Sequence, residues 1–310
     1  MELENNIILQ IKYCLFAFIL FIISGCSKEV IVDKNINKDK KLYAVAKYPT
    51  PVLSTGDFEQ VYGGADGKTL KKSPTGLIKE LEYVAYEGSV FEVTGTIDRG
   101  NHKIYKIYAH DYDIPELGLE LFVDSRFVDT TTVKPVERKI VLPSKADIYK
   151  YFDANEGALY VWGGNNVGGV SKMFEFYKPA GALDERDELE WGLKGVDCSG
   201  LIYEATNGYT PRNTHQLVYF GKPIKIAGLS ADEIVYKLQP LDLIVWKGHV
   251  IIVYDNKTTI ESSHSAWGVI KKDLHTVISK FIKNDRKPMD EWDDAQPKSF
   301  VVRRWYAENN

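Results

Sequence analysis

The pattern of apolar positions along this chain changes near residue 140. Between residues 42 and 135, short runs of β-branched and aromatic residues are separated by Gly- and Asp-rich turns, a pattern typical of β-strands. A long Gly-rich segment, residues 51–82, interrupts these runs. The clearest runs are SVFEV (89–93), HKIYKIY (102–108) and LGLELFV (117–123). The pattern predicts an all-β domain over residues 42–135, folded as a small barrel or sandwich.

Beyond residue 140, helical and strand patterns are mixed. Ser144 is a typical N-cap residue and predicts a helix over residues 144–152. Further along, HVIIVY (249–254) and TTIES (258–262) lie on either side of the turn Asp255-Asn256-Lys257, which predicts a β-hairpin. Residues 140–310 are therefore predicted to form a second domain, and the fold class is α+β.

The N-terminus carries a different pattern. Residues 7–23 are almost entirely apolar and are followed by Ser24-Gly25-Cys26, as in a secretory signal that ends in small residues. This ending resembles the lipobox of bacterial lipoproteins, which implies removal of residues 1–25 and lipid on Cys26. The polar residues 26–41 would then be a flexible tether. An uncleaved membrane anchor is the alternative, and both readings predict an exported, membrane-anchored protein of the bacterial cell envelope.

Composition narrows the function classes. The 310 residues are 44% apolar and 26% charged, which suits a folded protein with two domains. The net charge is −4 and no basic stripe is present, so nucleic-acid binding has no electrostatic support. No group of His, Cys and Asp residues has the spacing of metal ligands, and we expect neither a metal nor a cofactor.

The cysteines point to a site. The chain has three, and after loss of the signal with Cys14 and lipidation of Cys26, only Cys198 remains as a free thiol. An unpaired thiol in an exported protein is either a buried apolar residue or a nucleophile. Apolar residues follow Cys198 at helical spacing, which places it at a helix N-terminus, where a thiolate and an oxyanion are both stabilised. A nucleophilic thiol also needs a base, usually a histidine, and His249 begins the predicted hairpin.

The sequence around these residues resembles the NlpC/P60 family of bacterial cell-wall hydrolases. The resemblance consists of five blocks in order: YVWGG (160–164), DCSG (197–200), TPRNT (210–214), PLDL (240–243) and GHV (248–250). It implies a papain-like fold over residues 140–310, with Cys198 as nucleophile and His249 as base. In the family, the residues at Tyr160, Asp197 and Ser199 contact the substrate.

Three features depart from the family or extend beyond it. Leu241 stands where the family usually has Gly. The segment from residue 165 to 195 separates two of the blocks and is rich in aromatic residues, so we expect it to wall one side of the cleft; surface decoration is the alternative. The run LELFVDSRFV (119–128) resembles the last strands of bacterial SH3-like (SH3b) domains, which favours the barrel for residues 42–135.

The third member of the catalytic group depends on the hairpin register. A three-residue loop at 255–257 pairs Tyr254 with Thr258 and places Glu261 diagonally beside His249. A two-residue loop reverses the parity and selects Ser262 or His264. A carboxylate is suited to orient an imidazole and to stabilise its charged form. We therefore expect Glu261, with His264 as the alternative.

The resemblance implies a substrate and partners. The expected substrate is a peptidoglycan stem peptide, cut between γ-D-glutamate and diaminopimelate or lysine, as in the YkfC-type endopeptidases of this family. Their SH3b domain restricts them to short peptides with a free N-terminal L-Ala. We expect Glu80 and Glu82 to be solvated charges at a strand edge, and the alternative is that they contact that amine. We expect a monomer held to the membrane by its lipid. The alternatives are an amidase cutting the muramoyl–L-Ala bond, an acyltransferase, or an inactive wall-binding lipoprotein.

Overall fold

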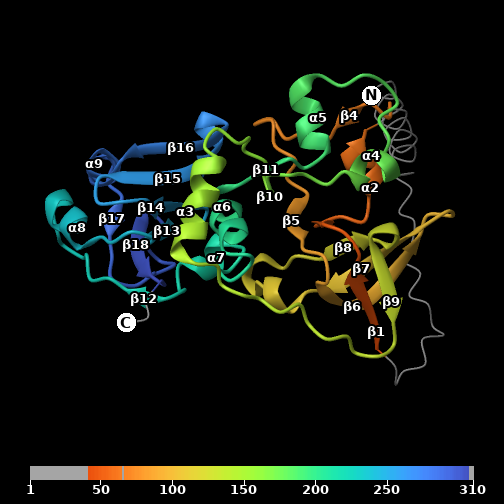
Figure 1. Ribbon diagram of the computed structural model, residues 1–310, viewed down its shortest axis with the longest axis horizontal. Coiled ribbons are helices and arrows are strands. Elements are labelled where there is room, and N and C mark those ends of the chain that lie inside the picture. The colour runs from red at the N-terminus through yellow and green to blue at the C-terminus, as the bar shows by residue number, and fades with distance from the viewer. Residues whose placement is uncertain (1–40, 65, 307–310) are drawn as a thin grey trace, which may run out of the picture. The chain divides into compact units, whose positions relative to one another are not determined.

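Figure 1 presents the computed structural model of the chain, which describes residues 41–64 and 66–306. The predicted signal sequence, the lipidation site Cys26 and all but the last residue of the tether lie outside these ranges. Within them, no helix combines the length and the apolar character needed to cross a bilayer.

The N-terminal part is built on an antiparallel sheet of seven strands in the order β5-β2-β8-β7-β6-β1-β9. The predicted runs form three of these strands. The bounds are β1 (Leu42–Ala46), β2 (Thr50–Leu53), β5 (Leu81–Ala85), β6 (Val90–Asp98), β7 (Lys103–Tyr108), β8 (Leu121–Asp124) and β9 (Val128–Thr131). The segment between β2 and β5 holds α2 (Phe58–Val61), β3 (Tyr62–Gly63) and β4 (Thr69–Leu70), and short 3-10 turns η1 (His110–Tyr112), η2 (Pro115–Leu117) and η3 (Ser125–Phe127) follow β7 and β8.

The predicted barrel is not formed, because β5 and β9 at the two ends of the sheet do not pair with each other. The edge of β5 instead has a polar partner from the second part of the chain. The Val84 N–H donates to Asn165 Oδ1 at 2.8 Å, and Asn165 Nδ2 donates to the Val84 carbonyl oxygen at 2.8 Å. An exposed sheet edge needs such partners for its backbone groups. One side-chain amide therefore takes the place of a closing strand at this point (β5 beside β10 in Figure 1).

The second part contains another antiparallel sheet, in the order β12-β18-β13-β14-β15-β16, with the short β17 alongside β18. Because side chains alternate along a strand, its two faces bury different residues. Val250 and Ile252 pack toward α3 and α6, whereas Ile251 and Val253 pack toward α8 and α9 (Figure 1). The strands are β12 (Lys222–Pro223), β13 (Leu243–Trp246), β14 (His249–Val253), β15 (Thr258–Ser263), β16 (Gly268–Asp273), β17 (Lys287–Pro288) and β18 (Ser299–Arg304), and the helices are α3 (Lys145–Ala154), α6 (Cys198–Ala205), α7 (Thr214–Leu217), α8 (Ala231–Lys237) and α9 (Leu274–Lys283), with the 3-10 turn η4 (His264–Ala266).

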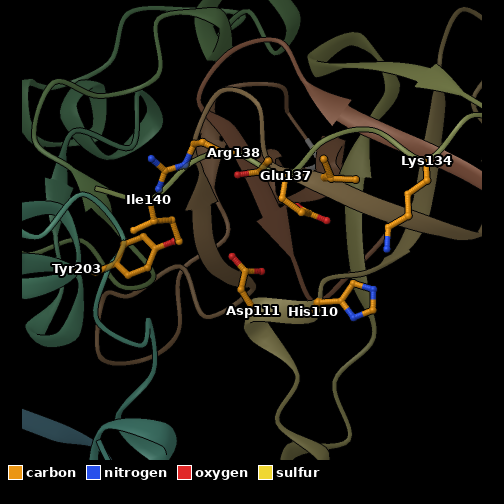
Figure 2. Close-up of a pocket in the computed structure, with 9 residues that line it drawn as sticks. His110, Asp111, Lys134, Glu137, Arg138, Ile140 and Tyr203 are labelled. Atoms are coloured by element: carbon orange, nitrogen blue, oxygen red, sulfur yellow. The ribbon is translucent and has the colours of Figure 1, made fainter. Parts of the chain in front are cut away.

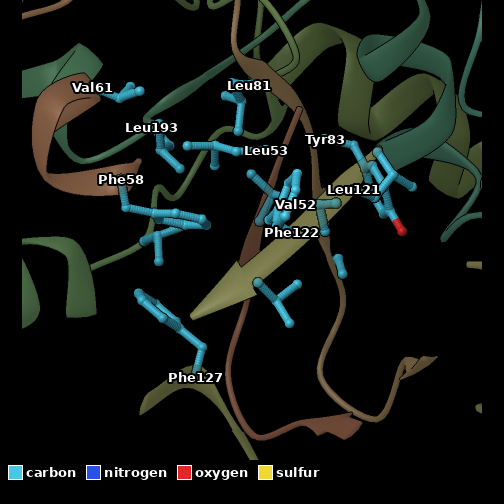
Figure 3. Close-up of a cluster of buried hydrophobic side chains, with 14 of the residues drawn as sticks. Val52, Leu53, Phe58, Val61, Leu81, Tyr83, Leu121, Phe122, Phe127 and Leu193 are labelled. Carbon is cyan, nitrogen blue, oxygen red and sulfur yellow. The ribbon is translucent and has the colours of Figure 1, made fainter. Parts of the chain in front are cut away.

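The aromatic segment from residue 165 to 195 does not wall the cleft as expected, and it is not surface decoration. It comprises β10 (Asn165–Asn166), α4 (Lys172–Phe176), α5 (Glu185–Trp191) and β11 (Gly195–Val196). Trp191 is fully buried in the core of the N-terminal part, with its ring 6.3 Å from that of Tyr62. Leu193 joins the same cluster beside Leu53 and Phe58 (Figure 3). Large aromatic side chains stabilise a fold most where they bury the most surface area, and here the N-terminal sheet provides the apolar surface that buries them.

The segment that connects the two parts, residues 132–144, is also held against both of them. Arg138 donates to the Asn207 carbonyl oxygen at 2.8 Å, and its guanidinium carbon lies 4.6 Å from the centre of the Tyr86 ring. Figure 2 shows Arg138 and Ile140 of this segment around a cavity of about 380 Å³, opposite Asp111 and near Tyr203 of α6. The described residues on both sides of the segment thus share contacts as well as a core.

Candidate active site

Cys198 is the first residue of α6, as the helical spacing after it predicts. Asp197 is the N-cap, and its Oδ1 accepts a hydrogen bond from the Gly200 N–H at 2.6 Å. Gly200 is required here, because a Cβ atom at this position would lie only 1.9 Å from the Gly164 carbonyl oxygen. The YVWGG and DCSG blocks are therefore in direct contact. This contact fixes the start of α6 and with it the sulfur of Cys198.

His249 is the first residue of β14, and its Nε2 lies 2.5 Å from Oε2 of Glu261 on β15. Val253 pairs with Thr259, and the Tyr254 N–H donates to the Thr258 carbonyl oxygen. This is the register that the three-residue loop predicts. The other oxygen of Glu261 accepts from Lys272 Nζ at 2.7 Å. The carboxylate is thus held from both sides, and the imidazole faces one of its oxygens.

Cys198 interacts electrostatically with the His249–Glu261 pair. Burial alone would lower the pKa of His249, but the charge and hydrogen bonding of Cys198, together with those of Glu261, outweigh it and raise the pKa to about 10. Burial alone would likewise raise the pKa of Glu261, but hydrogen bonds from His249 and Lys272 lower it. This arrangement favours an imidazolium and a carboxylate beside the sulfur of Cys198.

His264, the alternative third member, lies elsewhere. Its Nε2 is 3.2 Å from the carbonyl oxygen of Thr75, and its ring packs 4.4 Å from that of Trp267. Within the described residues, no hydrogen bond or ring contact joins His264 to His249. Its ring also lies 5.6 Å from that of Tyr160, so it supports the wall of the site near Cys198.

Asp197 and Ser199 belong to a buried polar network centred on Arg212. The guanidinium donates to both Asp197 oxygens, at 2.8 and 3.0 Å, and to Ser199 Oγ at 2.9 Å. It also donates to the Gly164 carbonyl oxygen at 3.1 Å and to Asn165 Oδ1 at 3.1 Å. Burial by itself would lower the pKa of Arg212, but Asp197 raises it above the ordinary value. Arg212 therefore joins three of the sequence blocks.

Arg212 was not among the predicted site residues. The only signal for it was its place in the TPRNT block, since nothing in the local sequence reveals that its partners lie 13 to 48 residues away. Because Asp197 is neutralised by Arg212, its carboxylate is already engaged within the protein. This geometry supports a positioning role for Asp197 and leaves its predicted contact with substrate a prediction.

A cavity of about 310 Å³, called here the first cavity, opens on Cys198. One side is formed by Tyr160, Trp162 and His215, and the other by Glu82, Tyr112 and Leu117 of the N-terminal part. Glu82 Oε2 accepts from the Tyr112 hydroxyl at 3.0 Å, and burial raises the pKa of Glu82. Glu80, the other candidate for the amine contact, instead pairs with Lys71 at 2.7 Å and does not line the cavity.

Tyr160 also lines the first cavity. Burial raises the pKa of its phenol far above the ordinary value, and the charges of Asp197 and Cys198 raise it further. The phenol is therefore neutral at neutral pH, and it can donate a hydrogen bond beside the sulfur.

No family model matches the chain, and a comparison with curated proteins finds no match either. Among solved structures, the chain is similar to an NlpC/P60 family protein from Bacillus cereus, with 14% identity and a TM-score of 0.32. That match covers 86% of this chain and 64% of the other, which is less than two thirds of its length.

Two further solved structures are similar to this chain. The peptidoglycan hydrolase RipB from Mycobacterium tuberculosis has 20% identity and a TM-score of 0.30, over 54% of this chain and 70% of that one. NlpC1 from Trichomonas vaginalis has 12% identity and a TM-score of 0.36, over 87% and 94%. All of these TM-scores lie below 0.5, so the function proposed next rests on the residues of this chain.

Proposed function

We propose that this protein is a cell-wall hydrolase, namely a cysteine peptidase that cleaves the γ-D-glutamyl–diamino acid bond of short peptidoglycan peptides. The observation that carries the proposal is the Cys198–His249–Glu261 group, with the sulfur at a helix start and the imidazole 2.5 Å from a carboxylate. A cavity beside the sulfur is available for the acyl part of a substrate. The sequence blocks that resemble the NlpC/P60 family supply the substrate class.

The proposed reaction uses Cys198, His249 and Glu261 in turn. The Cys198 thiolate attacks the amide carbonyl, and the backbone N–H of Cys198 at the helix start stabilises the oxyanion, with Tyr160 beside it. His249 then gives its proton to the leaving amine, and a thioester remains on Cys198. A water molecule gives a proton to His249, attacks the thioester and releases the acyl part as a carboxylic acid. Glu261 holds the imidazole in position through both steps.

The first cavity supports a preference for short peptides. Glu82 and Tyr112 come from the N-terminal part and face the same space as Cys198. A carboxylate in that position would bind the free amine of an N-terminal L-Ala, and an L-Ala that is joined to muramic acid in a glycan strand has no such amine. Glu82 is therefore the amine contact in this proposal, while Asp197 and Arg212 hold Ser199 and the start of α6 in place.

The test is cleavage of L-Ala-γ-D-Glu-meso-diaminopimelate, followed by product analysis. The wild-type protein should release L-Ala-D-Glu, and Cys198→Ala should lose at least about 10⁴-fold in rate, as expected for removal of a nucleophile. Retained cleavage by Cys198→Ala would exclude Cys198. Release of L-Ala alone would move the cleaved bond to the L-Ala–D-Glu position, and transfer of the acyl group without hydrolysis would make the protein an acyltransferase.

The proposed contact between Glu82 and the substrate amine is tested by comparing free and acetylated peptides. Acetylation of the substrate N-terminus should reduce kcat/KM for the wild type by about tenfold or more, because it removes the charge that Glu82 binds. Glu82→Gln should show a much smaller difference between the two substrates. Glu80→Gln is the matched control, since Glu80 lies outside the cavity. Equal rates for free and acetylated peptides in the wild type would contradict the restriction to free N-termini.

Membrane attachment through a lipid on Cys26 is part of the same proposal. Growth with a clickable palmitate analogue should label the wild-type protein and leave Cys26→Ala unlabelled. Labelling of both proteins would place the lipid on another residue, and labelling of neither would favour the uncleaved membrane anchor.

A further inference from the structure

A second cavity, of about 580 Å³, adjoins the same imidazole. His249 and Glu261 line it, whereas Cys198 lines only the first cavity. The Cys198–His249 pair therefore stands between the two spaces. In the proposed reaction the acyl part stays on the sulfur and the amine leaves after taking a proton from His249. A leaving group that extends past the imidazole would enter the second cavity.

The floor of the second cavity is apolar. Trp246, Ile251, Val277 and Phe281 contribute to it, from β13, β14 and α9. The Trp246 ring lies 5.2 Å from the His249 ring and 5.3 Å from the Phe281 ring. A stem of methylene groups would fit such a floor, because it gains free energy when it leaves water.

Two cations on the wall of this cavity have no carboxylate partner among the described residues. The Arg286 guanidinium carbon lies 4.1 Å from the centre of the Trp246 ring, and the guanidinium donates a hydrogen bond to the Ser299 carbonyl oxygen at 2.8 Å. Lys280, on the last turn of α9, lines the same cavity and forms no ion pair in the described ranges. The third cation, Lys272, is engaged by Glu261. A half-buried guanidinium without a counter-ion is suited to bind an anion.

We propose that the second cavity binds the leaving diamino acid, with Arg286 and Lys280 holding the carboxylate at the far end of its side chain. This inference rests on the proposed function. The side chain of diaminopimelate ends, after three methylene groups, in a carbon that carries both an ammonium and a carboxylate, whereas that of lysine ends in an ammonium alone. The two cations can bind the carboxylate of the first side chain, and the second offers them none. The structure thus assigns a preference for diaminopimelate, set by these two residues.

The test compares two peptides that differ at this one group, L-Ala-γ-D-Glu-meso-diaminopimelate and L-Ala-γ-D-Glu-L-Lys. The wild type should favour the first in kcat/KM by about tenfold or more, the range expected from charge-assisted hydrogen bonds. Lys280→Gln and Arg286→Gln should each reduce this ratio several-fold by raising KM for the diaminopimelate peptide. Turnover of the lysine peptide should stay unchanged, and it also serves as the measure of correct folding.

Lys283→Gln is the matched control, because it makes the same charge change on the same helix outside the cavity. It should leave the ratio at the wild-type value. If Arg286→Gln does not fold, Arg286→Lys and Lys280→Gln keep the comparison. Isothermal titration of Cys198→Ala with free meso-diaminopimelate and with L-lysine measures the preference without turnover, and it should detect binding of the first only.

The outcomes separate the two proposals. Equal rates on the two peptides, or a loss in the variants that is the same for both, would overturn the inference while the peptidase survives, since the cations would then not read the far carboxylate. Cleavage of neither peptide by the wild type would refute the proposed function. Titration without a difference between the two amino acids would refute the inference on its own.

Discussion

The two cavities that flank the Cys198–His249 pair differ in whether the charge of their arginine is paired. Around the first, the buried Arg212 is paired with Asp197 and has further acceptors in Ser199 and two other groups, so its charge is used up inside the protein. Around the second, Arg286 stacks on Trp246 and has no carboxylate partner in the described ranges. A paired charge holds the chain together, whereas an unpaired one is available for a ligand. The location of an arginine in a site therefore says less than the identity of its partners.

The strongest way to break this comparison is to remove the paired charge. Arg212→Met should leave Asp197 buried without a counter-ion and reduce the free energy of unfolding by about 3–5 kcal/mol, measured by urea denaturation. Arg286→Met, which strands no carboxylate, should cost much less. The surface residue Lys47, 3.4 Å from an exposed Asp129, gives the baseline, and Lys47→Met should change stability by about 1 kcal/mol or less. Equal losses for Arg212→Met and Arg286→Met would contradict the distinction.

The contact between His249 and Glu261 gives the next largest effect. Glu261→Gln should lower kcat/KM on the diaminopimelate peptide by about 100-fold, because the amide orients the imidazole poorly and does not stabilise its charge. His264→Ala removes a ring from the wall near Tyr160 but no partner of His249, and it should cost far less. The reverse order of effects would make His264 the third member of the group.

The pH dependence of activity also tests the contact between His249 and Glu261. The pKa of His249 is raised to about 10, so the imidazolium that protonates the leaving amine is present below that pH and is lost as the pH rises through it. Activity should therefore persist well into the alkaline range before it falls. In Glu261→Gln one of the groups that raise this pKa is gone, so the alkaline limb should move to lower pH. An alkaline limb at the same pH in both proteins would separate Glu261 from the titration.

Glu204 offers the smallest and most specific test, because it is a half-buried acid with no cation beside it among the described residues. It accepts hydrogen bonds from the Tyr151 hydroxyl and the Val167 N–H, and burial raises its pKa to about 7 from 4.5. The folded protein thus holds this proton more tightly than the unfolded chain, and stability should fall as the pH rises from about 4.5 to about 7. In Glu204→Gln this contribution should vanish, with a gain on the order of 2 kcal/mol over wild type at pH 8 relative to pH 4. Thermal unfolding across this pH range measures the difference, and parallel curves would contradict the assignment.

Local patterns predicted the elements that carry the chemistry. The spacing after Cys198 gave the start of α6, and the three-residue turn after Tyr254 gave the register that brings Glu261 to His249. Both depend on neighbours within a few residues or across one hairpin, so the local sequence is sufficient to predict them. The catalytic roles of these residues remain predictions until the variants above are measured.

Long-range contacts were not accessible in the same way. The role of Arg212 depends on partners in two other blocks, and the place of Trp191 depends on an apolar surface more than 100 residues earlier. The predicted barrel is not closed, and a side chain 81 residues away bonds to its edge strand. Each of these contacts depends on which surfaces pack together in three dimensions. Local patterns in a single sequence do not reveal that packing.

The burial of Trp191 and Leu193 in the core of the N-terminal part limits how this protein can be divided. A fragment beginning near residue 140 would expose these side chains to water and would leave Asn165 without Val84, so it should express as aggregates. An engineer who wants the C-terminal half alone would have to excise residues 167–194 as well and reconnect the chain across the gap. The halves of this protein are thus not interchangeable modules, and exchange of the N-terminal half between relatives would require the aromatic segment to move with it.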